Sequence, residues 1–371
     1  MKLVHLTRLA FAFSATLTLN GCLDSGNSSG PDDTLTGQIH FNGLSGIRYQ
    51  TSSQSGTTNQ DGQFHYYPGE TLTLQVGNLV VAEGVPARPY ISFLEFMEEP
   101  RAKLQKPGVD ERQLSNHAVT ESELRQRDDI TNLTRFLMAL TWSDALEENQ
   151  GLEIRGRVVS QLDAALADPQ LPDTIDFSLP TAEFTAQDSA ANRLLAQICF
   201  FPEGDELCQK PPTLAEIGSA PPRPTAGEPD PDIDYREDLL ALRERILGGA
   251  RTLDIFDNER ADIYLKQELD AITRALSRQY YLSPEQAKHP ATDTSIQSVQ
   301  IRKVGGEPSL ARMEAQSTRP NDVYIHAHDW QSASADYVVT GEAGGESELL
   351  INFQPDDNYR WVRKEIRVLI D

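Results

Sequence analysis

The chain has 371 residues, with 33 Lys and Arg against 56 Asp and Glu. The resulting formal net charge of −23 argues against proteins that bind DNA, RNA or anionic headgroups through Lys and Arg, so no nucleic acid partner is expected. The length predicts two or three structural units. After the N-terminal segment no stretch is apolar enough to predict a membrane span, which argues against a channel or permease.

Residues 1–21 have the pattern of a cleavable signal peptide. Positive charge precedes a mostly apolar run at 9–19, which is shorter than the roughly 20 residues of a transmembrane helix. The run ends in Leu-Asn-Gly-Cys, a lipobox that directs lipid attachment to Cys22. We therefore predict a lipoprotein in which 22–33 form a lipidated polar tether. The alternative is a secreted protein in which Cys22 is incidental.

The residue after the cysteine bears on which membrane the protein reaches. Leu23 stands where an aspartate would usually signal retention at the inner membrane. We therefore expect a protein of the bacterial cell envelope, anchored at the periplasmic face of the outer membrane or transported on to the surface. Its contact with the membrane would run through the N-terminal lipid.

Residues 34–96 predict a small β-sandwich. Short segments with partly alternating apolar residues are separated by turn pairs such as Asn42-Gly43 and Asp61-Gly62. Several strands at such spacing are typical of a sandwich module.

Residues 97–208 predict a helical region. Ile130, Leu133, Leu137 and Leu140 recur at the spacing of one helix face. Two further amphipathic stretches, at 157–167 and 189–199, have the same period.

Cys199 and Cys208 are the two cysteines left if Cys22 carries lipid. They enclose a short segment with the composition of a turn, and in an oxidising compartment they are expected to form a structural disulfide. The alternatives are a metal site, which would need two more ligands, and a redox pair, which usually has a two-residue spacing.

The next segments predict a break and then two helices. Residues 209–233 are rich in proline and predict a linker or surface loop, and 234–282 predict a helical pair. One stripe of the pair runs from Tyr235 to Ile246 and the other from Leu265 to Tyr280. We expect these stripes to pack into a core within the chain. The alternative is that they form a coiled-coil surface for a partner.

Residues 283–371 predict a β-rich C-terminal domain, with turns at Gly305-Gly306 and Gly344-Gly345. The chain as a whole therefore predicts an α+β fold, in which a helical middle region separates an N-terminal small β-sandwich from this domain.

His326 and His328 are the candidate metal ligands in the sequence. His326 and His328 would share one face of a strand, while Asp329 would point away. Because zinc sites use three or four protein ligands, these histidines are weak candidates, and two exposed side chains are the simpler reading. We expect no metal and no cofactor.

Two acidic segments are candidate calcium loops. Asp230, Asp232 and Asp234 match the start of such a loop, but its glycine and glutamate positions hold other residues. A second segment lacks regular alternation of acids, and it comprises Asp144, Glu147, Glu148, Asn149 and Gly151.

No catalytic signature is present in the sequence. A His-Glu-x-x-His pair and a Walker loop are missing, and the Gly-x-Ser-x-Gly spacing occurs only at 26–30, in the polar tether, where no strand-to-helix elbow is expected. We therefore expect a protein that is not an enzyme.

Two stretches resemble a known family. GLSGIRYQTSSQSGTTNQDGQFHYYPGETLTLQVGNLVV is similar to a module of proteobacterial, Pseudomonas-type envelope lipoproteins, and DDITNLTRFLMALTWSDALEENQGLEI resembles the stretch that often follows it. The resemblance covers roughly 37–155. Some relatives carry the label "organic solvent ABC transporter permease", which fits badly without membrane spans. The module also resembles a carboxypeptidase-regulatory-like sandwich, which implies a fold and no chemistry.

These observations favour a non-catalytic, lipid-anchored envelope lipoprotein that acts as a binding or scaffold protein with an envelope protein as partner. The alternative is a periplasmic accessory of an ABC-type envelope transport system that binds a lipid or apolar small molecule.

The lipid anchor is directly testable. Replacing Cys22 with Ser removes the thiol that receives the lipid, so metabolic labelling with palmitate should be lost and the protein should leave the membrane fraction. Continued labelling of the Cys22→Ser variant would overturn the lipoprotein prediction.

Overall fold

The computed structural model describes residues 34–143, 149–225, 228 and 230–371. Helices and strands both contribute substantially, which confirms the α+β class. In the described part of the chain, no helix combines the length and apolar character needed to cross a membrane.

The N-terminal module consists of two sheets with strand orders β5-β1-β8 and β4-β3-β6-β7. Alternation places Leu72, Leu74 and Val76 of one strand in the core. The strands are β1 (Leu35–Ile39), β3 (Arg48–Gln50), β4 (Ser55–Thr57), β5 (Gln63–Tyr66), β6 (Thr71–Val76), β7 (Leu79–Pro86) and β8 (Tyr90–Ile91).

The middle region follows the predicted helical pattern around α3 (Asp128–Ala139), where Ile130, Leu133, Leu137 and Leu140 are fully buried. The other elements here are η1 (Phe93–Glu95), α1 (Glu98–Leu104), β9 (Gly108–Val109), β10 (Ser115–Asn116), α2 (His117–Arg125), α4 (Gly156–Leu166), α5 (Thr181–Phe184), α6 (Ala190–Leu195) and η2 (Glu206–Cys208).

The hydrophobic core does not divide at the predicted boundary near residue 97. One cluster of buried residues runs from Ile39 through the helices to Leu269. Strand β11 (Leu152–Glu153) of the middle region also pairs in parallel with β2 (Leu44–Ser45) of the N-terminal module. The first two predicted units therefore fold around a common core.

The proline-rich segment is not wholly a loop. It contains α7 (Leu214–Ser219), whose capping box joins Thr213 and Glu216. This helix contacts α8 (Arg236–Gly248), where the predicted apolar stripe is only partly covered. The short helices η3 (Leu253–Ile255) and α7 were not anticipated, because each spans too few residues to show a period.

The last helix, α9 (Asn258–Arg278), ends before the predicted Tyr280. Tyr280 instead opens β12 (Tyr280–Ser283), where Tyr280 and Leu282 are buried and alternate with the exposed Tyr281. The strand pairs with β14 (Gln297–Lys303), so the tyrosine that continued the helical stripe in the sequence belongs to the next sheet.

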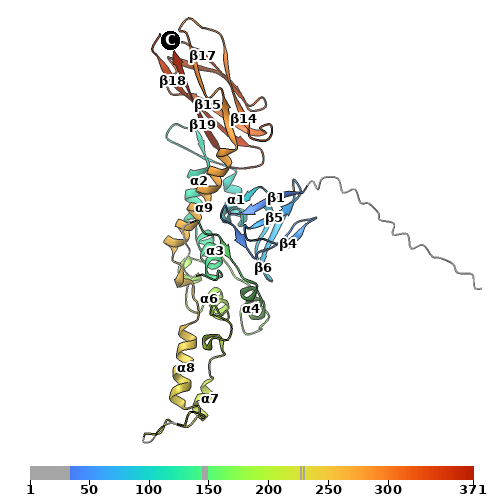
Figure 1. Cartoon of the computed structure of the whole chain (residues 1–371), viewed down its shortest axis with the longest axis vertical. Helices are drawn as coiled ribbons and strands as arrows, with labels where there is room; N and C mark the ends of the chain where they lie inside the picture. The colour runs from blue at the N-terminus through green and yellow to red at the C-terminus, as the bar shows by residue number, and fades with distance from the viewer. Residues whose placement is uncertain (1–33, 144–148, 226–227, 229) are drawn as a thin grey trace, which may run out of the picture. The chain divides into compact units, whose positions relative to one another are not determined.

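The C-terminal region is a sandwich of two four-stranded sheets, with orders β12-β14-β17-β16 and β13-β19-β18-β15, around a second hydrophobic cluster (Figure 1). Strand β13 was missed because its side chains are mostly polar. The strands after β12 are β13 (Gln286–His289), β14 (Gln297–Lys303), β15 (Leu310–Ser317), β16 (Val323–Asp329), β17 (Ser334–Val339), β18 (Glu346–Pro355) and β19 (Val362–Ile370).

The contact between β2 and β11 requires a glycine. Gly46 has φ +82°, and a Cβ atom there would overlap the Ile154 carbonyl oxygen. Gly69 has a similar φ of +86°, but a Cβ atom there would meet nothing within 4 Å. An alanine at either position would therefore carry the same backbone strain, and the two positions differ in the close approach of another segment to Gly46.

This difference predicts unequal effects of alanine. Gly69→Ala should cost about 1–2 kcal/mol through the left-handed backbone alone. Gly46→Ala should cost about 1–3 kcal/mol more, because overpacking adds to the same strain. Urea unfolding of both variants measures the difference, and equal destabilisation would contradict the docking of β11 on the module.

Candidate functional site

Some predicted sites fall where the structure gives no description. Cys22 lies outside the described residues, as do Asp144, Glu147 and Glu148 of the second acidic loop. Of that loop, Gly151 packs directly against the backbone of Asn42, which leaves no room for a side chain.

The first acidic segment is engaged in local turn contacts. The Asp230 carboxylate accepts the Asp232 N–H at 3.0 Å, and the Tyr235 hydroxyl accepts the Asp230 N–H at 3.0 Å. Asp230, Asp232 and Asp234 are all exposed. These contacts stabilise the entry to α8, as expected of an aspartate-rich turn.

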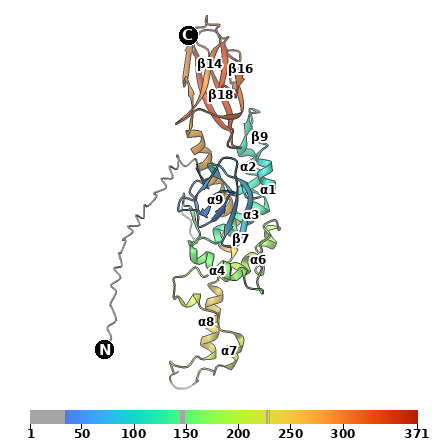
Figure 2. The same cartoon turned by 90° about the vertical axis from the view of Figure 1, so that its right-hand side faces the viewer.

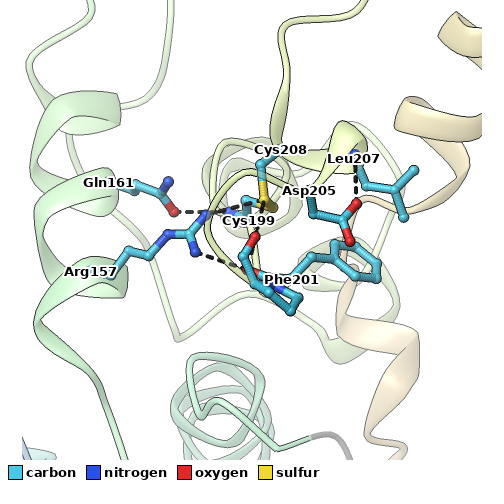
Figure 3. The surroundings of a disulfide bond; sticks show 8 residues. Arg157, Gln161, Cys199, Phe201, Asp205, Leu207 and Cys208 are labelled. Carbon is cyan, nitrogen blue, oxygen red and sulfur yellow. Dashed lines mark hydrogen bonds between the residues drawn. A yellow bond between two sulfur atoms is a disulfide. The ribbon is translucent and has the colours of Figure 1, made fainter.

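Cys199 and Cys208 are joined by a disulfide, with Cα atoms 5.4 Å apart. Figure 3 shows its contacts with α4: the Cys199 N–H donates to Gln161 Oε1 at 2.9 Å, and Arg157 Nη1 donates to the Phe201 carbonyl at 2.8 Å. The disulfide therefore closes a loop that is held against a helix of the first core, which is a structural role.

His326 and His328 lie on the exposed part of β16. A β-bulge between Ile325 and Ala327 interrupts the alternation on which the shared-face expectation relied. The Asp329 carboxylate accepts the N–H groups of Gln331 and Ser332 in the following turn. Among the described residues no three His, Cys, Asp or Glu side chains gather as metal ligands.

The polar residues that the structure does gather lie along α9. Near its first half, the Phe93 N–H donates to His40 Nε2 at 3.1 Å, so His40 Nδ1 carries the proton and donates to the Tyr264 hydroxyl at 2.8 Å. His40 is fully buried. Burial, aided by the positive charge of Arg360, lowers the pKa of His40 from 6.5 to about 3.

One turn further along α9, Glu268 caps the β1–β2 connection. Its carboxylate accepts the Phe41 N–H at 2.6 Å, the Asn42 N–H at 3.0 Å and the Asn42 side-chain amide at 2.6 Å. Burial raises the pKa of Glu268 although these bonds favour the charged form. Helix α9 is thus hydrogen-bonded to the N-terminal module at two levels.

The second half of α9 is linked to the C-terminal sandwich through α2. His117 Nδ1 accepts the Trp361 N–H at 3.0 Å, which leaves the proton on Nε2 to bond Thr273 at 3.0 Å. Leu276 of α9 belongs to the second hydrophobic cluster. The same helix therefore contributes to both cores.

The β18–β19 connection leads from the sandwich into the first core. Tyr359 packs in the first cluster and donates its hydroxyl to Glu121 Oε1 at 2.6 Å. The next residue, Arg360, is fully buried with Nε 3.1 Å from the same carboxylate. Burial acts to lower the pKa of Arg360, but neighbouring negative charge outweighs it and the pKa is raised. None of the three guanidinium nitrogens has an aligned hydrogen-bond acceptor among the described residues.

We call the contact of Tyr359 and Arg360 with Glu121 of α2 the junction. Next to this junction the structure has a cleft, formed by two adjoining pockets of about 360 and 310 Å³. Ser115 and Trp361 line both pockets, with α2, α9 and β19 around the larger one and β15 around the smaller. Trp361 is 5% exposed, and its indole N–H has no acceptor among the described residues. We take this cleft as the candidate binding site.

Sequence reasoning missed this site for a clear reason. Contacts such as Ser115–Asn352 and His117–Trp361 join residues more than 200 positions apart. Neither partner stands in a motif, and the two histidines with defined roles, His40 and His117, were not singled out.

Comparisons with known proteins give little further guidance. No family model matches the chain, and no curated protein matches it. Two solved structures are similar in part: surface layer protein SbsC domains 1–6, with 11% identity, TM-score 0.19 and coverage of 25% of this chain and 13% of that chain, and SbsC domains 4 and 5, with 11%, 0.18, 24% and 50%. The matches span half or less of those chains, and at these scores they support no argument about fold or function.

The buried His40 predicts a pH dependence of stability. Because its folded pKa of about 3 lies below the unfolded 6.5, its contribution is complete above pH 6.5 and is lost as the pH falls towards 3. The loss approaches ~1.4 kcal/mol per pH unit in that window.

Asparagine suits the test, because it tolerates the φ of 60° at this position and does not titrate. Urea unfolding at pH 6.5 and 4.5 should show the original protein losing roughly 2–3 kcal/mol more than His40→Asn. Parallel pH profiles of the two proteins would contradict a buried neutral His40.

Proposed function

We propose that this chain is a non-catalytic, lipid-anchored protein of the bacterial cell envelope that acts as a binding or scaffold protein. The observation that carries the proposal is the sharing of α9 between two hydrophobic cores (Figure 2). The lipobox at Cys22 and the resemblance of 37–155 to envelope lipoproteins support the location.

The shared helix favours a scaffold because it restricts motion between the parts that it joins. Tyr264 and Glu268 bond the N-terminal module, while Leu276 packs in the core of the C-terminal sandwich. A binding surface held by buried contacts loses less conformational entropy when it meets a partner than one on a flexible linker.

The C-terminal sandwich offers a surface suited to protein contact. Strand β16 is the edge of its sheet, and among the described strands it pairs with β17 alone. Its Tyr324 is 53% exposed and Trp330 in the following turn is 45% exposed. Exposed edge strands accept a partner's backbone, and aromatic residues often supply most of the binding energy.

A second candidate function is that of an accessory to an ABC-type envelope transport system. The observation that favours it is the largely apolar pocket of about 360 Å³ beside α9. Such a pocket is at the lower end of the roughly 300–1,000 Å³ range of small-ligand sites.

The scaffold proposal is tested by recovery of a partner. Full-length protein, cross-linked in intact cells and purified from the membrane fraction, should bring down one envelope protein in stoichiometric amount. The double variant Tyr324→Ala and Trp330→Ala should reduce that recovery by about tenfold or more, since aromatic hot-spot residues carry about 2 kcal/mol or more each.

The matched control is the double variant Ile296→Ala and Val304→Ala, which removes exposed apolar side chains (57% and 66%) of the same sandwich away from β16. It should leave recovery unchanged. Equal loss in both variants, or recovery of no stoichiometric protein, would overturn the scaffold proposal.

A further inference from the structure

The larger pocket of the cleft, of about 360 Å³, has walls that are mainly apolar. It lies where α2, α9 and the start of β19 meet, and β10 and β18 add Ser115, Asn116 and Asn352 to its lining. A preformed apolar pocket with few polar groups is the usual form of a small-molecule site.

The ionisable groups on this lining are almost all matched. Glu121 is paired with Arg360, Asp270 lies 2.7 Å from Lys266, and Arg363 lies 2.7 Å from Asp110. His117 is neutral, because both ring nitrogens are hydrogen-bonded and burial lowers its pKa.

Arg274 differs from these groups. It lines the pocket from α9, is exposed, and has no carboxylate partner among the described residues. Arg274 is therefore an unmatched cation on the lining of the larger pocket, although the chain as a whole is strongly acidic. An anionic group is the complement that this charge would attract.

Trp361 supplies a second unmatched donor. Its indole N–H is buried and lacks an acceptor among the described residues, and Trp361 is one of the residues that line the pocket. A buried donor without an acceptor costs about 1–3 kcal/mol, so a ligand that provides the acceptor gains affinity. The indole ring at the same time offers an apolar surface to the rest of the ligand.

We propose that this pocket binds a small apolar molecule bearing one carboxylate, which accepts hydrogen bonds from Trp361 and Arg274. The proposal deepens the second candidate function, since it names the class of molecule that such an accessory would hold. A carboxylate fits better than a phosphate, because the pocket has one unmatched cation and a phosphate dianion would leave charge unpaired.

Isothermal titration calorimetry with octanoate tests the proposal on the purified full chain. Octanoate should bind one site with a Kd of about 0.1–1 mM, the range expected for a ligand of roughly ten non-hydrogen atoms. 1-Octanol, which keeps the chain and lacks the charge, should bind at least about threefold more weakly. Octyl phosphate should also bind more weakly than octanoate.

Two variants assign the binding to this pocket. Trp361→Phe keeps an aromatic ring and removes the N–H, so octanoate should bind about tenfold more weakly while 1-octanol is unaffected. Arg274→Gln should weaken octanoate at least about threefold. Arg278→Gln, an exposed arginine one turn further along α9 and outside the pocket lining, is the matched control and should bind octanoate unchanged.

The proposal is overturned if octanoate does not bind, if Arg274→Gln and Arg278→Gln have equal effects, or if octyl phosphate binds more tightly than octanoate. Circular dichroism of Trp361→Phe shows whether that variant folds. If it does not fold, the effect of Arg274→Gln, which changes an exposed residue, tests the proposal. Failure here leaves the scaffold proposal standing, because partner recovery is tested at Tyr324 and Trp330, and neither residue lines the larger pocket.

Discussion

The ion pair between Arg360 and Glu121 is the contact around which the two cores meet. Arg360 is fully buried and stands between Tyr359, in the first core, and Val362, in the second. Taking such a charge out of water costs several kcal/mol, and a carboxylate at 3.1 Å offsets that cost only where the geometry persists. The β18–β19 connection therefore has one favourable position against α2, and that position fixes the sandwich against the helices.

The carboxylate of Glu121 is itself held in place by a second contact. The Tyr359 hydroxyl donates to the oxygen that Arg360 approaches, and the Arg360 guanidinium lies 4.3 Å from the centre of the Tyr359 ring. Tyr359 and Arg360, which are neighbours in the β18–β19 connection, thus both contact Glu121 of α2. The buried pair contributes to a specific arrangement more than to net stability, since replacing such a pair with apolar groups is often neutral.

The sequence contained enough information for the class of fold and for most elements. The period of Ile130, Leu133 and Leu137 located α3, and the two cysteines with a turn between them located the disulfide. Local patterns succeed where one segment determines its own structure. The local pattern was wrong at Tyr280, because a tyrosine fits the apolar face of a helix as well as a strand. The pairing of Tyr280 with β14 places it in the strand.

The junction could not be predicted for a different physical reason. Glu121, His117 and Arg360 have ordinary neighbours in the sequence, and only the folded chain removes them from water. The chemically most tempting cluster, His326 with His328, stayed exposed, while His40 and His117 acquired fixed protonation through burial. The polar residues of this junction gain their roles from distant segments and not from local motifs.

The candidate pocket is a consequence of the same junction. Where a helix and the end of a sandwich are held by ion pairs and hydrogen bonds, their side chains do not interdigitate as they do inside one core, and a space remains between them. The acids on the lining of the larger pocket are paired, Glu121 with Arg360 at the junction and Asp270 with Lys266 along α9. Distant acids are screened beyond a Debye length of about 8–10 Å. A protein with a net charge of −23 can therefore present, beside α9, a small and mainly apolar site at which Arg274 is an unmatched cation.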